Sequence, residues 1–136
     1  MKPKRVLVCG GRDFGLVKAE YHFITCTLDS VFHEKGWEFT PDEFGNTLPN
    51  VLIISGEAKG ADSVATEYAM TRWTGYQGFP AQWDKYGRGA GHIRNQQMID
   101  EGKPDLVIAF PGGRGTADMV TRAKGRGIEV IEVKYE

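Results

Sequence analysis

One stretch of the chain combines a short apolar run, a glycine-rich turn and a helical pattern, in that order. Residues 105–110 are too few for a helix and rich in Leu, Val, Ile and Phe, which is typical of a buried parallel strand. Residues 111–116 (PGGRGT) end the run, and apolar residues at helical spacing continue from 117 to about 125. Glycines let a ligand approach the backbone closely. The free N–H groups and positive dipole end of such a helix favour an anion such as phosphate, so we predict an anion site over this turn.

Two more glycine-rich loops follow short apolar runs. Residues 4–9 and 51–55 predict buried strands, and the loops 10–15 (GGRDFG) and 56–62 (GEAKGAD) come directly after them. A weaker edge strand is predicted at residues 76–79. The last strand is predicted at 128–133, after Gly127 as a helix stop, and the expected helices cover 16–35, 62–73, 90–101 and 117–125.

Five strands that alternate with four helices predict an α/β fold, a Rossmann-like three-layer domain with a mostly parallel sheet. We expect the strand order 3-2-1-4-5. Because ligands bind at the carboxyl ends of the strands in such sheets, the three glycine-rich loops are expected to converge on one crevice.

Length and charge narrow the function classes. A chain of 136 residues predicts a single domain over 1–136. The net charge, 17 minus 18 or −1, gives no overall attraction for nucleic acid or membrane. Cys9 and Cys26 match no metal or redox motif, and no metal or cofactor is expected. No stretch is long and apolar enough to span a bilayer, so we expect a cytoplasmic protein.

Two segments have no clean periodicity. Residues 36–50 predict a surface connection in which Trp37, Phe39 and Phe44 either cover an edge of the core or, less favoured, contact a partner. Residues 81–91 predict a polar loop. Its Trp83 either stacks on a base or ribose or covers the core, and Tyr86 is a second candidate for stacking.

Arginines and glycines supply the predicted ligand-binding residues. Arginine forks bind phosphate oxygens in pairs. Four arginines can reach the crevice, although Arg88 is interpreted as a solvated surface charge. The predicted binding residues are Gly10, Gly11, Arg12, Gly56, Lys59, Gly60, Asp62, Trp83, Arg94, Asn95, Gly112, Gly113, Arg114, Gly115 and Thr116.

Carboxylates are the candidate catalytic residues. Asp13, Glu57 and Asp118 can bind ribose hydroxyls or handle protons. Asp62 can do the same, but capping of its helix is the simpler interpretation. His92 is interpreted as a structural helix residue rather than a base.

The same residues carry a family resemblance. Residues 55–62 (SGEAKGAD) resemble the SGxAxG(A/I)D loop of the SLOG superfamily, which includes the DNA-processing protein A and bacterial YpsA proteins. Residues 94–98 and 111–116 resemble the R-x-x-x-M and PGGxGT elements of the Lonely Guy phosphoribohydrolases and lysine-decarboxylase-like proteins. With the opening CGGRDF, the set is most similar to the YspA-like, cpYpsA-related SLOG group over nearly the whole chain except 36–50.

The resemblance implies a Rossmann-like fold and a nucleotide or nucleotide-derived ligand, such as a phosphorylated nucleoside or ADP-ribose, that is sensed or handled. The alternative is an N-glycosidase that releases base and ribose 5-phosphate. Lonely Guy enzymes carry a functional glutamate in PGGxGTxxE, where this chain has Met119. Binding of single-stranded DNA is disfavoured by the near-neutral charge. Helices 62–73 and 90–101, with Met70, Trp73 and Met98, are expected to support a homodimer.

Overall fold

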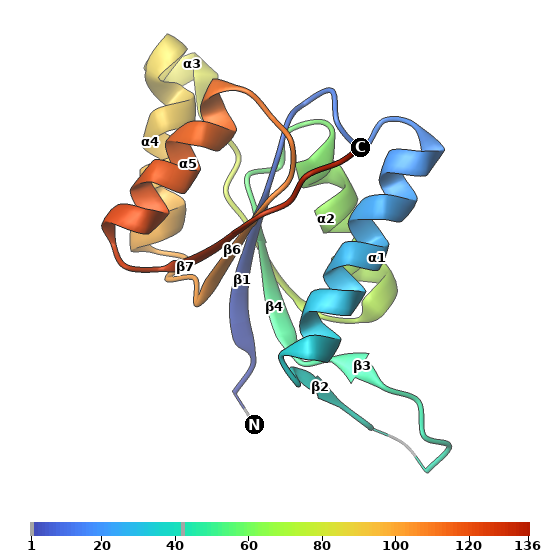
Figure 1. Cartoon of the computed structure of the whole chain (residues 1–136). Helices are drawn as coiled ribbons and strands as arrows, with labels where there is room; N and C mark the ends of the chain where they lie inside the picture. Colours follow the sequence, from blue (N-terminus) through green and yellow to red (C-terminus); the bar gives the residue numbers. More distant parts are fainter. Residues whose placement is uncertain (1, 42) are drawn as a thin grey trace.

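The computed structural model describes residues 2–41 and 43–136 and is a three-layer α/β domain (Figure 1). Its main sheet has five parallel strands in the order β5-β4-β1-β6-β7, which is 3-2-1-4-5 in chain order. The predicted fold class and strand order are therefore confirmed. The strands are β1 (Lys4–Cys9), β4 (Val51–Ser55), β5 (Gly75–Gly78), β6 (Leu106–Ala109) and β7 (Glu129–Glu132).

Helices cover both faces of this sheet. Figure 1 shows α1 (Lys18–Glu34) and α2 (Ala61–Arg72) on one face, with α4 (Ala90–Asp100) and α5 (Arg114–Gly125) on the other. The chain changes face between β5 and β6, so the topological switch point lies between β1 and β6, which pair directly.

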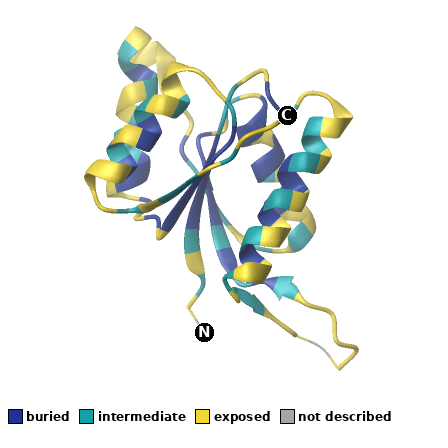
Figure 2. Cartoon of the chain, viewed as in Figure 1, coloured by how far each residue is buried: buried dark blue, intermediate teal, exposed yellow. Residues whose placement is uncertain are grey.

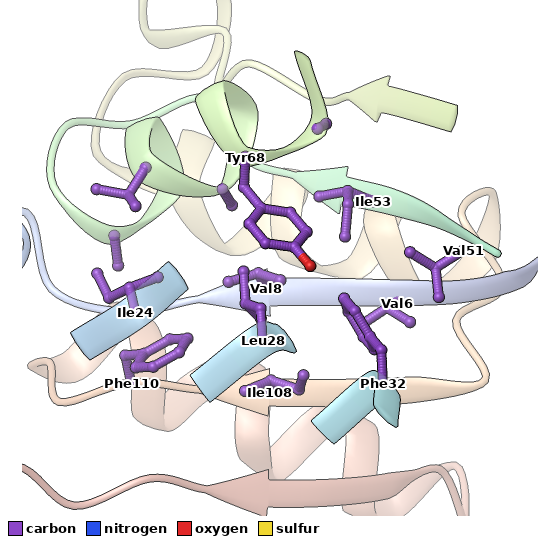
Figure 3. Close-up of a cluster of buried hydrophobic side chains, with 14 of the residues drawn as sticks. Val6, Val8, Ile24, Leu28, Phe32, Val51, Ile53, Tyr68, Ile108 and Phe110 are labelled. Atoms are coloured by element: carbon purple, nitrogen blue, oxygen red, sulfur yellow. The ribbon is translucent and has the colours of Figure 1, made fainter. Parts of the chain in front are cut away.

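The core is divided into two layers by β1. Val6 and Val8 pack in the layer under α1 and α2, whereas Leu7 and Cys9 pack in the layer under α4 and α5. Successive side chains of a strand point to opposite faces, which explains why a strand buried on both sides is continuously apolar. Figure 2 shows the buried residues concentrated along the sheet, and Figure 3 shows Tyr68 of α2 packed over Val8 in the first layer.

Helix α5 ends as its sequence predicts. Gly127 has φ +73°, a left-handed conformation that glycine adopts without steric cost. The Gly127 N–H donates to the carbonyl of Lys124 (3.0 Å), and the Ile128 N–H donates to that of Ala123 (3.0 Å). These bonds satisfy carbonyls at the helix end and turn the chain into β7.

The prediction of a polar loop at residues 81–91 is wrong in detail. It contains the short helix α3 (Trp83–Tyr86) and the 3-10 turn η1 (Gly87–Gly89), which leads into α4. Four residues are too few to show a helical period, and no side chain caps α3. Trp83 and Tyr86 are therefore fixed on a helix, and both side chains are exposed.

The connection at 36–50 carries a small hairpin, β2 (Glu38–Phe39) with β3 (Leu48–Pro49), that projects from the body in Figure 1. Trp37 packs partly buried against the core, as predicted. The prediction is wrong for the other two aromatics, because the side chains of Phe39 and Phe44 are 41% and 82% exposed. Phe39 lies in β2 and Phe44 in the connection to β3, and this hairpin projects away from the main sheet (Figure 1).

The apolar residues that suggested a homodimer are split between core and surface. Met98 of α4 is buried, so it is not part of an outer face. Met70 and Trp73, at the end of α2, are 74% and 84% exposed. The homodimer stays a prediction that rests on α2. In the part of the chain that the structure describes, every helix is too short or too polar to cross a bilayer.

Candidate functional site

The three glycine-rich loops meet at the carboxyl ends of the strands. The Gly11 N–H donates to the carbonyl of Pro111 (2.8 Å), which joins the loop after β1 to the loop after β6. The Ala61 N–H donates to the carbonyl of Gly11 (3.3 Å), which joins the loop before α2 to the same point. The strand order therefore brings segments about 50 and 100 residues apart to one edge of the sheet.

Some of the glycines are needed for this close approach. A Cβ at Gly10 would lie 2.6 Å from Cβ of Ala61, and one at Gly112 would lie 2.7 Å from the amide nitrogen of Gly11. Real Cβ atoms do not approach so closely. Gly113 and Gly115 are different, because a Cβ at either would meet nothing within 4 Å. Their open side faces the space over the turn.

A cavity of about 420 Å³ opens where the loops meet. Eleven of the fifteen predicted binding residues line it: Gly10, Gly11, Arg12, Asp62, Trp83, Arg94, Asn95, Gly113, Arg114, Gly115 and Thr116. Six further residues complete the lining: Cys9, Ala58, Arg88, Gly91, His92 and Met98.

The other four predicted binding residues lie outside the lining. A Cβ at Gly56 would come 2.8 Å from Cζ of Arg94, so this glycine admits the arginine to the site. Gly60 has φ +74° and packs against the carbonyls of the β1–α1 loop. Gly112 packs against Gly11, and Lys59 is exposed on the loop before α2.

The first turn of α5 presents backbone donors to the cavity. The helix begins with the bond from the Ala117 N–H to the carbonyl of Gly113 (3.1 Å). The N–H groups of the first helical residues, Arg114 to Thr116, therefore have no partner within the helix. These N–H groups add to the positive charge at the N-terminal end of the helix dipole. The surface beside them is open, because Gly113 and Gly115 have no side chain.

The cavity is strongly positive although the chain is not. Its lining holds four arginines and one carboxylate, and 4 minus 1 gives +3, against −1 for the whole chain. None of these arginines forms a salt bridge within the described residues. Arg88, interpreted from the sequence as a surface charge, is exposed and also lines the cavity.

Arg94 is the most enclosed of these arginines. Its Nη1 donates to the carbonyl of Gly56 (2.5 Å), and its Nε donates to Oδ1 of Asn95 (3.1 Å). Burial lowers the pKa of Arg94, because a guanidinium loses hydration inside the protein. The side chain stays protonated at neutral pH, so the protein holds a half-buried positive charge whose hydrogen-bond partners are neutral.

Asp62 is the one carboxylate in the cavity lining. It lies in the first turn of α2, but the residue that caps this helix is Gly60, so the interpretation of Asp62 as the cap is wrong. Burial raises the pKa of Asp62 to about 6, against the opposing effects of the Ala58 N–H and of Arg94 and Arg12. The group is therefore ionised at neutral pH but titrates close to it.

The three candidate catalytic carboxylates lie outside the cavity lining. Asp13 is exposed in the loop after β1. Glu57 has φ +57°, and its Oε2 accepts a bond from the Tyr76 hydroxyl (2.6 Å), which holds it over β5. Asp118 lies between α5 and α4, where it contacts the lining residues Asn95 and His92 without lining the cavity itself.

Asp118 joins two helices that carry site residues. Its Oδ2 accepts bonds from Nδ2 of Asn95 (3.0 Å) and from Nε of Arg122 (2.8 Å). Asn95 also donates to the carbonyl of Gly115 (3.1 Å), and Nδ1 of His92 lies 3.3 Å from Oδ1 of Asp118. These bonds lower the pKa of Asp118 although burial opposes them. Asp118 therefore fixes α4 against the first turn of α5.

An aromatic side chain closes one side of the cavity. The guanidinium of Arg12 lies over the ring of Trp83, 5.3 Å from its centroid, so the loop after β1 contacts α3. Trp83 is half exposed and belongs to the lining, which favours the stacking interpretation over a cover for the core. Tyr86 lies outside the lining.

Sequence reasoning missed Cys9, His92 and Met98 as parts of the lining. Cys9 is the last residue of β1, and position at a strand end was the available signal. Burial raises the pKa of the Cys9 thiol, so it is present as a neutral thiol. Within residues 2–41 and 43–136, no three His, Cys, Asp or Glu side chains are grouped as a metal ion would need.

Comparisons with known proteins show the family of the chain. The profile of the YspA, cpYpsA-related SLOG family matches residues 4–86, which include the first two glycine-rich loops. The chain is similar to the Gene 61 protein of Mycobacterium phage D29, with 34% identity over 102 residues that cover 70% of this chain and 81% of the phage protein. No solved structure matches the chain. The chain belongs to the YspA, cpYpsA-related SLOG family.

Proposed function

We propose that this protein binds a phosphorylated nucleoside or a similar nucleotide-derived molecule, such as ADP-ribose, and acts as its sensor or handler. One observation carries the proposal: the cavity lining has a charge of +3, and its arginines form no salt bridge within the described residues. An anion would supply the missing partners. Membership of the SLOG family supports a nucleotide-related ligand.

The phosphate is expected over the first turn of α5. Backbone N–H groups from Arg114 to Thr116 face the cavity there, and Gly113 leaves room above them. Arg94 supplies a charged donor from the neighbouring helix. Trp83 offers a flat apolar surface for the base. The volume of about 420 Å³ falls within the range of small-molecule sites, about 300–1,000 Å³.

Titration calorimetry with AMP, GMP, CMP, UMP and ADP-ribose tests the proposal, with adenosine as the matched ligand without phosphate. We expect at least one phosphorylated compound to bind, and adenosine to bind at least about 10-fold more weakly than AMP, because charge-assisted bonds to phosphate are lost. Equal affinities for AMP and adenosine, or no binding of any phosphorylated compound, would contradict it. A crystal soaked with the tightest ligand then gives its position.

Hydrolysis of the N-glycosidic bond is the second candidate, and the presence of Asp62 in the cavity favours it. Cleavage builds positive charge on the ribose, which a nearby carboxylate stabilises. At the position where Lonely Guy enzymes carry their glutamate, Met119 is buried in the core and has no charge. We therefore expect binding without efficient hydrolysis. Release of free base, measured by chromatography at a rate on the order of 1 per second, would favour the enzyme.

A further inference from the structure

Asp62 is buried, but its carboxylate does not use all of its capacity to accept hydrogen bonds from the protein. Its side chain is 6% exposed. Oδ2 accepts one bond, from the Ala58 N–H, at 3.3 Å. For Oδ1, no hydrogen-bond donor is found among the described residues, yet this atom is not sealed from solvent. Because Asp62 lines the cavity, its open acceptor positions face the cavity.

Residues of β4 and α2 hold the backbone of Asp62. The hydroxyls of Ser55 and Thr66 both donate to the carbonyl of Asp62, at 3.2 and 3.1 Å. Gly56 leaves room for the carboxylate, because a Cβ there would lie 3.0 Å from its Oδ2. These two bonds fix the backbone of Asp62, and the bond from the Ala58 N–H to Oδ2 (3.3 Å) holds its carboxylate.

The groups around the carboxylate come from four elements. Arg94 approaches from α4 and Arg12 from the loop after β1, and both lower the pKa of Asp62. The neutral thiol of Cys9 approaches from β1, and the Ala58 N–H belongs to the same loop as Asp62. Neither arginine forms a salt bridge with Asp62 within 4.0 Å. The carboxylate thus keeps acceptor capacity for a ligand.

The charge of the cavity restricts which donor Asp62 can accept. A cationic ligand group would be repelled by four arginines, whereas a neutral hydroxyl adds no charge. In a nucleotide, the sugar is the part bonded directly to the phosphate. Arg94 and Asp62 both flank Gly56, so a phosphate near Arg94 brings the sugar hydroxyls within reach of the carboxylate.

We propose that Asp62 accepts hydrogen bonds from the sugar hydroxyls of the ligand, so that the site selects sugar phosphates with free vicinal hydroxyls over phosphates that lack them. This inference rests on the proposed function, because the phosphate sets the position of the sugar. The inference adds the chemical class of the sugar to that of the phosphate.

The experiment compares AMP with its 2′,3′-dideoxy analogue by titration calorimetry, on the wild type, on Asp62→Asn and on the control Asp84→Asn. Asp84 lies on α3 and outside the cavity lining. We expect the wild type and Asp84→Asn to bind AMP at least about 10-fold more tightly than the analogue, because hydrogen bonds to a charged group are lost. Asp62→Asn is expected to reduce this preference to less than about 3-fold.

Equal affinity of the wild type for AMP and the analogue would overturn the inference and leave phosphate binding intact. A wild-type protein that binds none of AMP, GMP, CMP, UMP and ADP-ribose would overturn the proposed function instead. An undiminished preference in Asp62→Asn would assign the hydroxyls to another residue and also overturn the inference.

The pH dependence of the preference is a second measurement that needs no variant. Asp62 has a pKa of about 6, so it is ionised at pH 7.5 and mostly protonated at pH 5. The preference for AMP over the analogue is expected to fall from pH 7.5 to pH 5. The phosphate also titrates near pH 6, but both ligands share it and its effect cancels in the ratio. A ratio that does not change between these pH values would count against Asp62 as the acceptor.

Discussion

Two sets of arginines in this protein differ in what surrounds their guanidinium groups. Outside the cavity lining, three arginines, here called the outer set, pair with carboxylates; the pairs are Arg72–Asp29, Arg122–Asp118 and Arg126–Asp100. At the cavity, arginines of four different segments converge and none forms a salt bridge within the described residues; they are Arg12, Arg88, Arg94 and Arg114.

Arg94 of the cavity set carries its charge under a different physical condition from the arginines of the outer set. An exposed ion pair stabilises a protein by about 0–1 kcal/mol, since water already solvates both charges. A half-buried guanidinium without an anionic partner loses hydration and gains little in return, as the lowered pKa of Arg94 indicates. Positive charges that folding concentrates without neutralising them therefore distinguish a binding surface from an ordinary charged surface.

The largest effect on AMP affinity is expected from a side chain that fills the cavity beside its arginines. Gly113→Val places a branched side chain where the phosphate is expected and should weaken AMP binding about 100-fold or more. The fold should survive with some loss of stability, because a Cβ there meets nothing within 4 Å but the ψ of −141° lies outside the regions that a branched residue usually adopts. Titration calorimetry measures the affinity for AMP, and thermal unfolding measures the stability of the variant.

Gly125→Val is the matched control, since Gly125 ends the same helix and a Cβ there also meets nothing within 4 Å. Its affinity for AMP should equal that of the wild type. If both variants bind AMP normally, the first turn of α5 is not the phosphate site and the contrast between the two sets of arginines loses its functional meaning.

Removal of one cavity arginine should have the next largest effect. Arg94→Ala is expected to weaken AMP binding about 10-fold or more, the loss of one charge-assisted bond of about 1.5–3 kcal/mol. Arg126→Ala removes an arginine of the outer set and should change the affinity less than about 2-fold. Titration calorimetry measures the AMP affinity of both variants. Equal losses of affinity would show that the two sets of arginines do not differ in AMP binding.

A third prediction concerns the stability cost of the single cavity carboxylate. The pKa of Asp62 is raised from 3.8 to about 6, so the folded state holds this proton more tightly than the unfolded state. The contribution of Asp62 to stability is therefore most favourable below about pH 4, falls as the pH rises to about 6, and stays low above it. Two pKa units correspond to at most about 3 kcal/mol.

Asp62→Asn should accordingly be more stable than the wild type at pH 7.5 by roughly 1–3 kcal/mol, with the difference shrinking toward pH 4. Urea unfolding at both pH values measures it. A difference that is independent of pH would mean that the ionised carboxylate is solvated well enough to cost nothing.

The smallest effect is expected in the outer set. Arg72→Ala breaks an ion pair with Asp29 whose side chains are 33% and 48% exposed. It should lower the free energy of unfolding by less than about 1 kcal/mol and leave AMP binding unchanged. Urea unfolding and calorimetry test both parts, and a clear loss of AMP affinity would show that the outer arginines also act on the cavity.

The sheet and the loop positions were predictable from sequence because they depend on local signals. Short apolar runs followed by glycine-rich loops located β1, β4 and β6, weaker patterns located β5 and β7, and the alternation of strands and helices indicated the doubly wound order. The hairpin at 36–50 and helix α3 were not predictable, because segments of two to four residues have no period.

The site was predictable only in part, since loop membership does not fix side-chain direction. Asp62 and Glu57 share one loop, yet Asp62 enters the cavity while Glu57 is turned to Tyr76. Asp118 follows the glycine-rich turn 111–116 in sequence, but one more step around the helix directs it to Asn95. These side-chain directions depend on contacts with α4 and β5, which are far away in the sequence.

The pairing of β1 with β6 has a consequence for how the chain is synthesised. The Arg5 N–H donates to Asp105, 100 residues further along the chain, and the cavity forms at the end of this strand pair. A growing chain therefore has no site until its last third has left the ribosome, and such long-range pairing is formed slowly. Ligand at 100 times its dissociation constant would then add about 2.7 kcal/mol to the stability of only those molecules in which β1 and β6 have paired. Resistance to proteolysis in the presence of ligand would report that this pairing has formed.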